Sequence, residues 1–272
     1  MINETFSFPR FWKYFLYDLK QMWRGHSKAA VVIGLMSVFF YIIWVTGSLL
    51  LSHRWSAPGI EMRAIVVLVA FAVLELYQAR TYGHLTDRKA GSAWLMVPAS
   101  GTEKTVSMLL ITCIVLPVLF FVVYLLADGF LSLVDPTYGK ALLTGGAAAW
   151  QSILDALTAA EVEGVKISLG ALVFPAIFSL FLNFTYFLLC GLVFKKNKIL
   201  LAILVIYGIQ LLITSVGAFL LPSVNFHMDN VEDPMVVVNY VNGALNWATA
   251  IAALITAALF FGVWYRVKTL NH

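Results

Sequence analysis

Few residues of this 272-residue chain have both the type and the position that chemistry would need. Glu75 is the only acid placed well inside an apolar stretch, and an acid inside a membrane is a functional candidate by default. Arg80 follows about one and a half helical turns later, so pairing with a basic group is the favoured explanation of Glu75. Asn183 lies in another apolar stretch, where its amide could hydrogen-bond between helices. Glu75 and Asn183 are therefore the candidates for a polar site inside the membrane.

The motifs of catalysis and nucleotide binding are missing from the sequence. It contains no G-x-x-x-x-G-K-[ST] run for nucleotide phosphates, no H-E-x-x-H and no G-x-S-x-G. The five histidines are scattered, without the common spacing of a metal site or a catalytic base. We therefore expect no enzyme, no cofactor and no metal. If the protein moves a solute, the energy is expected to come from another subunit.

The most informative segment runs from Thr86 to Lys104 and has three parts. Its first part carries the residues Asp87, Arg88, Lys89 and Gly91. The apolar run that follows is too short to cross a membrane, so a short surface helix is predicted near 90–97. Pro98 ends that helix, because proline disfavours helical geometry in the residue before it. Ser100 and Glu103 then have the S-x-x-E form of a capping box, which predicts a rigid start for the next helix.

Six apolar stretches must position these residues. They cover roughly 29–52, 60–80, 106–127, 167–194, 198–222 and 244–265. Each is near or above the ~20 residues that a helix needs to cross ~30 Å of hydrocarbon. With 61% hydrophobic and 12% charged residues, the chain could not cover a water-soluble fold with polar groups. We predict an all-α membrane protein with six transmembrane helices in one domain, 1–272.

Basic residues occupy alternate gaps between these stretches. Only Arg54, Arg63, Lys140 and Lys166 lie in the first, third and fifth gaps, and the other 14 of the 18 lie elsewhere. Those 14 are Arg10, Lys13, Lys20, Arg24, Lys28, Arg80, Arg88, Lys89, Lys104, Lys195, Lys196, Lys198, Arg266 and Lys268. Cytoplasmic loops retain positive charge during insertion, so both termini are predicted in the cytoplasm, with the chain in a bacterial inner membrane. The net charge of +4 is spread where anionic membrane lipid would meet it, and it does not argue for nucleic acid.

The segment 8–25 is predicted to form an amphipathic helix before the first crossing. Large apolar side chains recur in it at steps of three and four, and basic residues occupy much of the remaining surface. A helix so rich in Trp, Phe and Lys is expected to lie in the membrane interface. Two roles stay open for it: an anchor for the first crossing, or a contact for a cytoplasmic partner.

The segment 86–104 resembles the cytoplasmic loop of permease subunits of ABC-2 type transporters, in a form similar to Bacteroidetes-like members. The matching positions are Arg88, Lys89, Gly91, Trp94, Leu95, Pro98, Ser100, Glu103 and Lys104. The resemblance implies that 90–97 is a coupling helix that docks into a separate ABC-type ATP-binding subunit. It also implies export, and a working unit with a second permease half, identical or paralogous.

Further expectations and two alternatives follow. Trp94 and Leu95 are the predicted apolar anchors of the docked loop, whereas Glu103 is expected to act mainly as a helix cap. The apolar stretches contain few polar groups, which predicts an apolar or amphiphilic substrate. The alternatives are a non-transporting scaffold or sensory subunit that binds another cytoplasmic partner, and a membrane-embedded enzyme acting on lipids. A P-loop ATPase encoded beside this gene would favour the transporter.

Overall fold

The computed structural model describes residues 6–25, 27–86, 91, 94, 96–148, 151–152, 155, 169–220 and 234–269. Across these residues the chain is helical and has no strand, which confirms the all-α prediction. It divides into two compact units, Met1–Thr81 with Pro98–Leu154, and Tyr82–Val97 with Asp155–His272. The chain thus leaves the first unit at Tyr82 and returns to it at Pro98.

Three helices in the described part of the chain are long and apolar enough to cross a membrane: Gly101–Val134, Val173–Val193 and Gly243–Lys268. A fourth crossing arises if the pair Lys28–Gly34 and Met36–Ser52, which is bent by 41°, counts as one. These helices indicate a membrane protein. The apolar stretch Lys198–Leu211, at the start of another helix, is shorter than these candidates. The helix at Ile60–Thr81, which contains four charged residues, is not among the candidates.

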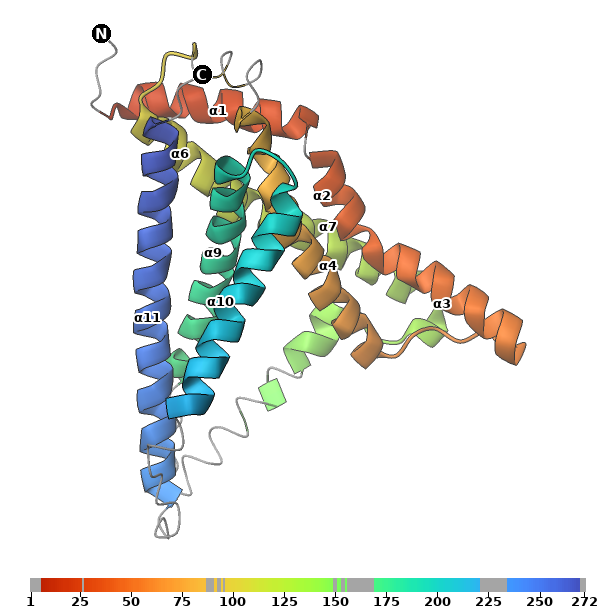
Figure 1. Ribbon diagram of the computed structural model, residues 1–272. Coiled ribbons are helices and arrows are strands. Elements are labelled where there is room, and N and C mark those ends of the chain that lie inside the picture. The colour runs from red at the N-terminus through yellow and green to blue at the C-terminus, as the bar shows by residue number, and fades with distance from the viewer. Residues whose placement is uncertain are drawn as a thin grey trace. The chain divides into compact units, whose positions relative to one another are not determined.

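The first unit contains the labelled helices α1 to α4, α6 and α7 (Figure 1), and a short 3₁₀ turn that follows α7. They are α1 (Phe8–Gly25), α2 (Ser27–Gly34), α3 (Met36–Ser52), α4 (Ile60–Thr81), α6 (Gly101–Leu110), α7 (Leu116–Val134) and the short 3₁₀ turn η3 (Pro136–Tyr138). Between α6 and α7, residues Ile111–Val115 form a π-helical turn, η2. α6, η2 and α7 together make the continuous helix Gly101–Val134. At ~1.5 Å per residue, its length exceeds the ~30 Å of a hydrocarbon core.

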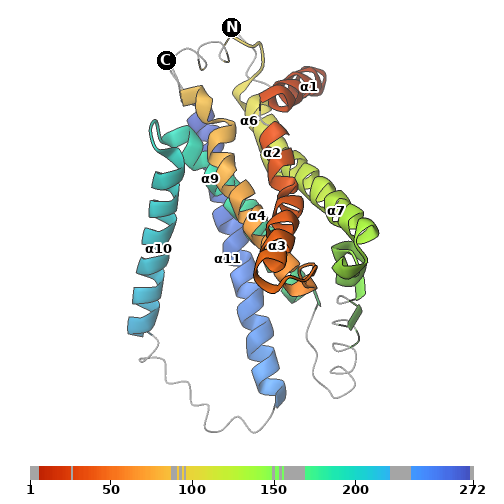
Figure 2. The ribbon, with the colours of Figure 1, turned by 90° about the vertical axis from the view of Figure 1, so that its right-hand side faces the viewer.

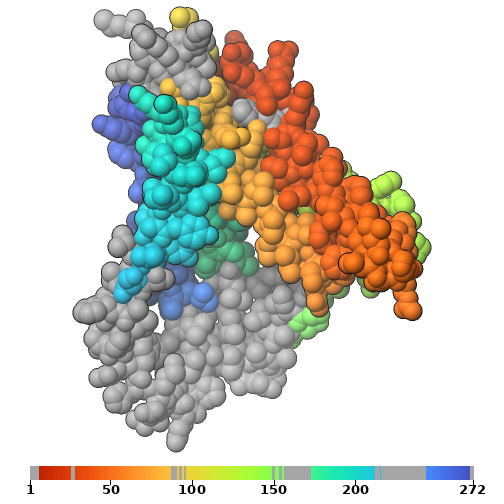
Figure 3. Space-filling model, turned by 45° about the vertical axis from the view of Figure 1, so that its right-hand side comes forward, coloured from red at the N-terminus to blue at the C-terminus, as the bar shows by residue number. Residues whose placement is uncertain are grey.

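The predicted first crossing is broken at Leu35, where a turn separates α2 from α3. Gly34 ends α2, and a Cβ atom there would lie 2.8 Å from Cγ1 of Val123 on α7. Glycine therefore permits the close approach of α2 to α7 (Figure 2), and it also weakens the helix at that point. Beyond the break, α3 (orange) lies beside the end of α7 (light green), as the space-filling view shows (Figure 3).

The π-helical turn η2 has an identifiable cause two residues beyond it. Pro117 has no backbone N–H, so it cannot donate to the carbonyl of Cys113, and its ring crowds that carbonyl. The turn widens, and the N–H of Leu116 donates to the carbonyl of Ile111, five residues back. The side-chain amide of Gln78 on α4 donates to the carbonyl of Thr112 at 3.4 Å. A neighbouring helix thus takes up one of the carbonyl groups in this altered register.

Among its described residues, the second unit contains three long helices and a short 3₁₀ turn. They are η1 (Gly83–Thr86), α9 (Leu169–Val193), α10 (Lys198–Leu220) and α11 (Pro234–Lys268). α9 and α11 run alongside each other and form the main contact of the unit (Figure 1). Thr185 and Leu188 of α9 and Val263 of α11 are buried. Asn197, in the left-handed conformation at φ 49°, joins α9 to α10, a role that asparagine tolerates.

Two helix boundaries differ from the sequence prediction. α7 continues to Val134, so Asp128 lies inside a helix, whereas the sequence placed it in an external loop from 128 to 166. α11 begins at Pro234, a residue suited to the first turn of a helix, about ten residues before the predicted crossing. Apolar content marks where a helix crosses hydrocarbon, but it does not mark where the helix ends. The sequence 147–163 also favours a helix by propensity, but it lies mostly outside the described residues.

Candidate partner-docking loop and its anchors

The helix that follows the loop starts with a complete capping box, as predicted. The backbone N–H of Glu103 donates to Oγ of Ser100 at 3.2 Å, and the N–H of Ser100 donates to Oε2 of Glu103 at 2.9 Å. Each residue satisfies a backbone donor that the first turn of a helix leaves without a partner. Glu103 is fully buried. The start of α6 is therefore held rigidly by its own residues.

Glu103 does more than cap its own helix, which sequence reasoning missed. The guanidinium of Arg10 on α1 forms a two-pronged ion pair with it, with Nε 2.8 Å from Oε2 and Nη2 2.7 Å from Oε1. The backbone N–H of Ser7 also donates to Oε1 at 2.9 Å. Hydrogen bonding to the carboxylate raises the pKa of Arg10. We call Ser7, Arg10, Ser100 and Glu103 the Glu103 cluster, and it joins α1 to the first turn of α6.

A second polar contact joins α1 to α6, about two turns beyond Arg10 along α1. Asp18 is buried and accepts a hydrogen bond of 2.6 Å from Oγ of Ser107 on α6. Phe11 and Met22 lie on the same buried face of α1. By contrast, Trp12 is 50% exposed. The face of α1 that packs in the protein and the face that carries exposed aromatic rings are thus different, although the sequence pattern merged them into one stripe.

The start of the loop between α4 and α6 is held by contacts within the second unit. Nζ of Lys198, the first residue of α10, donates to the carbonyl of Gly83 and to Oγ1 of Thr86, the latter at 2.7 Å. A Cβ atom on Gly83 would lie 3.0 Å from Nζ of Lys198, so the glycine leaves room for this contact. At the same end of the unit, Nε of Arg266 donates to the carbonyl of Leu192 in the last turn of α9. Basic residues from two predicted gaps thus stabilise the ends of neighbouring elements.

Between these two anchors, the loop is described at only some of its predicted site residues. Gly91 and Trp94 are helical, as the predicted short helix requires, and both are buried. Trp94 is only 7% exposed, whereas Met96 is 82% exposed. Pro98 is also exposed. The predicted site residues Arg88, Lys89 and Leu95 lie outside the described residues.

A second ion pair, which the sequence did not suggest, lies near the far end of the same long helix. Nη1 of Arg63 on α4 is 3.1 Å from Oδ1 of Asp128 on α7, and both side chains are almost fully buried. The hydroxyl of Tyr138 donates to Oδ1 of Asp128 at 2.8 Å, and the N–H of Leu142 donates to Oδ2 at 2.6 Å. The guanidinium also lies 4.2 Å from the centre of the Tyr138 ring. Burial and, after it, the hydrogen bond to Asp128 raise the pKa of the Tyr138 hydroxyl.

Asp135 extends this arrangement toward α3. Its Oδ2 accepts hydrogen bonds from the hydroxyl of Tyr41 at 2.7 Å and from Nε1 of Trp55 at 3.0 Å. Burial favours the neutral acid, but these bonds and those from Thr137 outweigh it and lower the pKa of Asp135 to about 2. The ring of Tyr41 lies edge-on to that of Tyr138, with centroids 5.6 Å apart. We call Arg63, Asp128, Asp135, Tyr41, Trp55 and Tyr138 the Asp128 cluster.

The two residues predicted to form a polar site inside the membrane remain separate candidates. Glu75 belongs to the first unit and Asn183 to the second, and both are half-buried. Each of them has an interaction partner, as a structural role requires. The described contacts give no shared site for the pair. The polar contacts described most fully in the first unit instead lie near the two ends of Gly101–Val134.

Each of the two ion pairs joins segments that the charge pattern predicted on the same side of the membrane. Arg10 and Glu103 come from two segments predicted to be cytoplasmic, and Arg63 and Asp128 from two predicted to be external. Comparisons with protein-family models, with curated proteins and with solved structures find no match to this chain. The functional argument therefore rests on the residues and contacts themselves.

Proposed function

We propose that the chain is the membrane-spanning permease subunit of an ATP-driven ABC-2 type exporter, with six crossings and both termini in the cytoplasm of a bacterium. It hydrolyses no ATP, and a separate ABC-type ATP-binding subunit supplies the energy through the loop between α4 and α6. This proposal rests on the resemblance of residues 86–104 to the coupling loop of such permeases. The two ion-paired clusters do not identify the substrate.

The observation that carries the proposal is the construction of this loop. Gly91 and Trp94 are helical in a stretch too short to cross a membrane, Pro98 follows, and the Ser100–Glu103 capping box then starts the apolar helix Gly101–Val134. A docking element needs a rigid connection to the parts it moves, because a flexible linker would absorb a displacement without passing it on. The capping box supplies that rigidity.

The loop also connects both units along the chain. Residues 82–97 belong to the second unit, where Lys198 holds η1, and residues 98–104 belong to the first, where Arg10 holds Glu103. A partner that moved residues 87–97 would therefore pull on an anchored element at either end. This is the property that coupling ATP hydrolysis to a rearrangement of membrane helices requires.

Met96 is the best-placed apolar anchor for the ATP-binding subunit. It is 82% exposed, whereas Trp94, the predicted anchor, is 7% exposed. Substituting Trp94 by alanine would remove packing as well as any docking contact, so loss of the partner after that change would be ambiguous. Methionine suits a surface that adapts to a partner, because its unbranched side chain fits irregular pockets.

The test is association with the P-loop ATPase encoded beside this gene, after co-expression and purification in mild detergent. Met96→Ala is expected to weaken association about tenfold or more, a change equivalent to ~1.4 kcal/mol. Met62→Ala is the matched control, since Met62 is 45% exposed on α4 and away from the loop. Equal association of both variants, or no neighbouring ATPase that binds the wild type, would favour a scaffold or sensory subunit instead.

The predicted topology has its own test. Lys140→Cys and Lys195→Cys place a thiol at two exposed sites predicted on opposite sides of the membrane, in a chain whose Cys113 and Cys190 have been replaced. A membrane-impermeant thiol reagent should label Lys140→Cys in intact cells and Lys195→Cys only after lysis. Labelling of both thiols from the same side would exclude the six-crossing arrangement.

The substrate and the second half of the transporter follow from the same proposal. An apolar or amphiphilic substrate is favoured because a path with few polar groups cannot compensate the desolvation of an ion. One chain of this size has little room to enclose a path, so a second permease half, identical or paralogous, completes the unit. Transport of a small inorganic ion as the preferred cargo would contradict this part of the proposal.

A further inference from the structure

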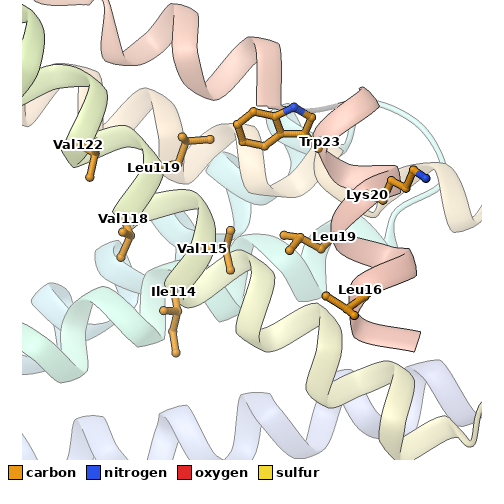
Figure 4. A pocket seen from close by; sticks show the side chains of 9 residues that line it. All are labelled: Leu16, Leu19, Lys20, Trp23, Ile114, Val115, Val118, Leu119 and Val122. Atoms are coloured by element: carbon orange, nitrogen blue, oxygen red, sulfur yellow. The ribbon is translucent and has the colours of Figure 1, made fainter. Parts of the chain in front are cut away.

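An apolar groove runs between α1 and the long helix Gly101–Val134 in the first unit (Figure 4). It encloses about 640 Å³, which lies within the ~300–1,000 Å³ range of small-molecule sites. From α1 it is lined by Leu16, Leu19, Lys20 and Trp23, and from η2 and α7 by Ile114, Val115, Val118, Leu119 and Val122. The two walls therefore come from the amphipathic helix and from a membrane-crossing helix.

The chemistry of the walls is that of an acyl-chain site. Eight of the nine lining side chains are apolar, and Lys20 is the exception. Figure 4 shows Leu19 and Trp23 of α1 pointing toward the wall formed by η2 and α7, while the ammonium group of Lys20 points away from it. Residues 114–122 span about 12 Å along the helix, which gives a narrow trough for a hydrocarbon chain. In a membrane, such a concave apolar surface is filled by hydrocarbon.

The π-helical turn helps to form one wall of this groove. Ile114 and Val115 lie in η2, where the backbone register is shifted by one residue, and Val118 lies on the helix beyond it. A π-turn costs stability and often marks a functional position. Here the turn is held by Pro117 and by the bond from Gln78 to the Thr112 carbonyl. The register of this wall therefore depends on a proline and on a hydrogen bond from α4.

The charge at the edge of the groove indicates which class of lipid headgroup it would bind. Lys13, Lys20 and Arg24 are exposed on α1, and Lys20 forms no hydrogen bond or ion pair with the part of the chain that the structure describes. The only acid of α1, Asp18, is buried and accepts a bond from Ser107, so it does not neutralise the rim. A positive rim beside an apolar trough complements a negatively charged headgroup with an attached acyl chain.

We propose that the groove binds one acyl chain of an anionic phospholipid of the bilayer, with the phosphate at Lys20. The bound lipid fills the space between α1 and α7, so it holds the amphipathic helix against the membrane-crossing helix. This inference does not depend on the proposed ATP-binding partner, and it can be tested on the purified chain alone.

The experiment uses the full-length chain in detergent with phosphatidylglycerol that carries a photoreactive diazirine in one acyl chain. Crosslinked peptides are identified by mass spectrometry. Val118→Trp fills the groove and is expected to lower crosslinking to residues 114–122 at least tenfold. Leu126→Trp is the matched control, because Leu126 is 69% exposed on the same helix but does not line the groove, and it should leave the crosslinking unchanged.

Headgroup selection is tested with a second pair of variants. Wild type should prefer phosphatidylglycerol over phosphatidylcholine about fivefold, which corresponds to the ~1 kcal/mol expected for one basic side chain near an anionic surface. Lys20→Gln should remove this preference without abolishing the crosslink. Lys195→Gln, an exposed change between α9 and α10 that does not line the groove, should keep the preference.

Three results would overturn the proposal. Crosslinks spread evenly over exposed apolar residues would mean that only the general lipid layer is present. Crosslinks of equal yield for both headgroups, unchanged by Lys20→Gln, would exclude the anionic rim. A disulfide between two copies of Leu19→Cys would show that a second chain covers the groove. If Val118→Trp does not yield a monodisperse protein, Val122→Trp and competition by unlabelled phosphatidylglycerol provide the same comparison.

Discussion

The Glu103 cluster and the Asp128 cluster hold opposite ends of the same long helix, and they differ in how they do it. In the Glu103 cluster the Arg10 side chain is 30% exposed and Glu103 is fully buried. In the Asp128 cluster both partners are buried, with 3% of Arg63 and 1% of Asp128 exposed. One arginine can exchange its bonds with water or with a partner, whereas the other has no such alternative.

The difference in burial between the two arginines indicates which end of the helix Gly101–Val134 can respond to a partner. A buried ion pair is costly to break, because removing one charge leaves the other in a medium of low polarity. The Asp128 cluster therefore acts as a permanent clamp between α4, α7 and the segment after it. The Glu103 cluster lies next to the proposed docking loop, and its arginine can rehydrate when α1 moves. A device that transmits a displacement needs one fixed end and one adjustable end.

Asp128→Ala is expected to have the largest effect on stability. It leaves the Arg63 guanidinium buried without its carboxylate, and Nε of Arg63 already has no hydrogen-bond partner in the described part of the chain. Breaking a buried pair in this way costs ~3–5 kcal/mol of unfolding free energy. Thermal or denaturant unfolding of the protein in detergent measures the loss.

The matched variant for Asp128→Ala replaces both partners. Arg63→Met together with Asp128→Leu removes the lone charge and should recover most of the lost stability. A double variant as unstable as Asp128→Ala would mean that the hydrogen bonds to Tyr138 and Leu142 matter more than the charge balance.

Glu103→Ala comes next, with an expected loss of ~2–3 kcal/mol. The capping bond contributes ~1 kcal/mol, and the bonds that Ser7 and Arg10 donate to the carboxylate add the remainder. Glu61→Ala is the control, since Glu61 is an exposed acid in the first turn of α4, and it should change stability by less than ~0.5 kcal/mol. Unfolding of the three proteins in the same detergent provides the comparison.

Ser100→Ala separates the local part of the Glu103 cluster from the tertiary part. It removes the acceptor of the Glu103 N–H but leaves the Arg10 ion pair in place, so a loss of ~1 kcal/mol is expected. Unfolding measurements that give the same loss for Ser100→Ala and Glu103→Ala would show that the contact with α1 contributes nothing to stability.

The effect of Asp135→Asn on stability should depend on pH. The pKa of Asp135 is lowered to about 2 in the folded protein, from 3.8 for the free side chain. A lowered pKa stabilises the fold above the unfolded value, and this contribution is lost as the pH falls from about 4 to about 2. The gap in melting temperature between the wild type and Asp135→Asn should therefore close across that window. A gap that stays constant down to pH 2 would contradict the hydrogen-bonded carboxylate.

The sequence alone predicted the features that depend on neighbouring residues. A helix was predicted at 8–25 and is found at Phe8–Gly25, because its large apolar side chains recur at helical spacing whatever lies around them. The capping box at Ser100 and Glu103 was predicted for the same reason, since its bonds join residues three apart. The helices predicted over 60–80, 167–194 and 198–222 begin at Ile60, Leu169 and Lys198, and the helix predicted from the capping box begins at Gly101.

Other features could not be predicted, because their partners lie far apart in the chain. Arg10 and Glu103 are separated by 93 residues, and Arg63 and Asp128 by 65, so no spacing rule relates them. The burial of Trp94 and the exposure of Met96 likewise depend on what packs against each side chain and not on residue type.

Composition and periodicity by themselves determined that this chain is helical and belongs in a membrane, because hydrocarbon excludes unpaired backbone groups and favours apolar side chains at every position along a helix. Only the tertiary structure decided which charges meet and which face of α1 packs against α6. It also decided that a groove opens between α1 and α7. The physical reason is distance: hydrogen bonds, ion pairs and packing act over a few ångströms, and only folding brings together residues 60 to 100 positions apart.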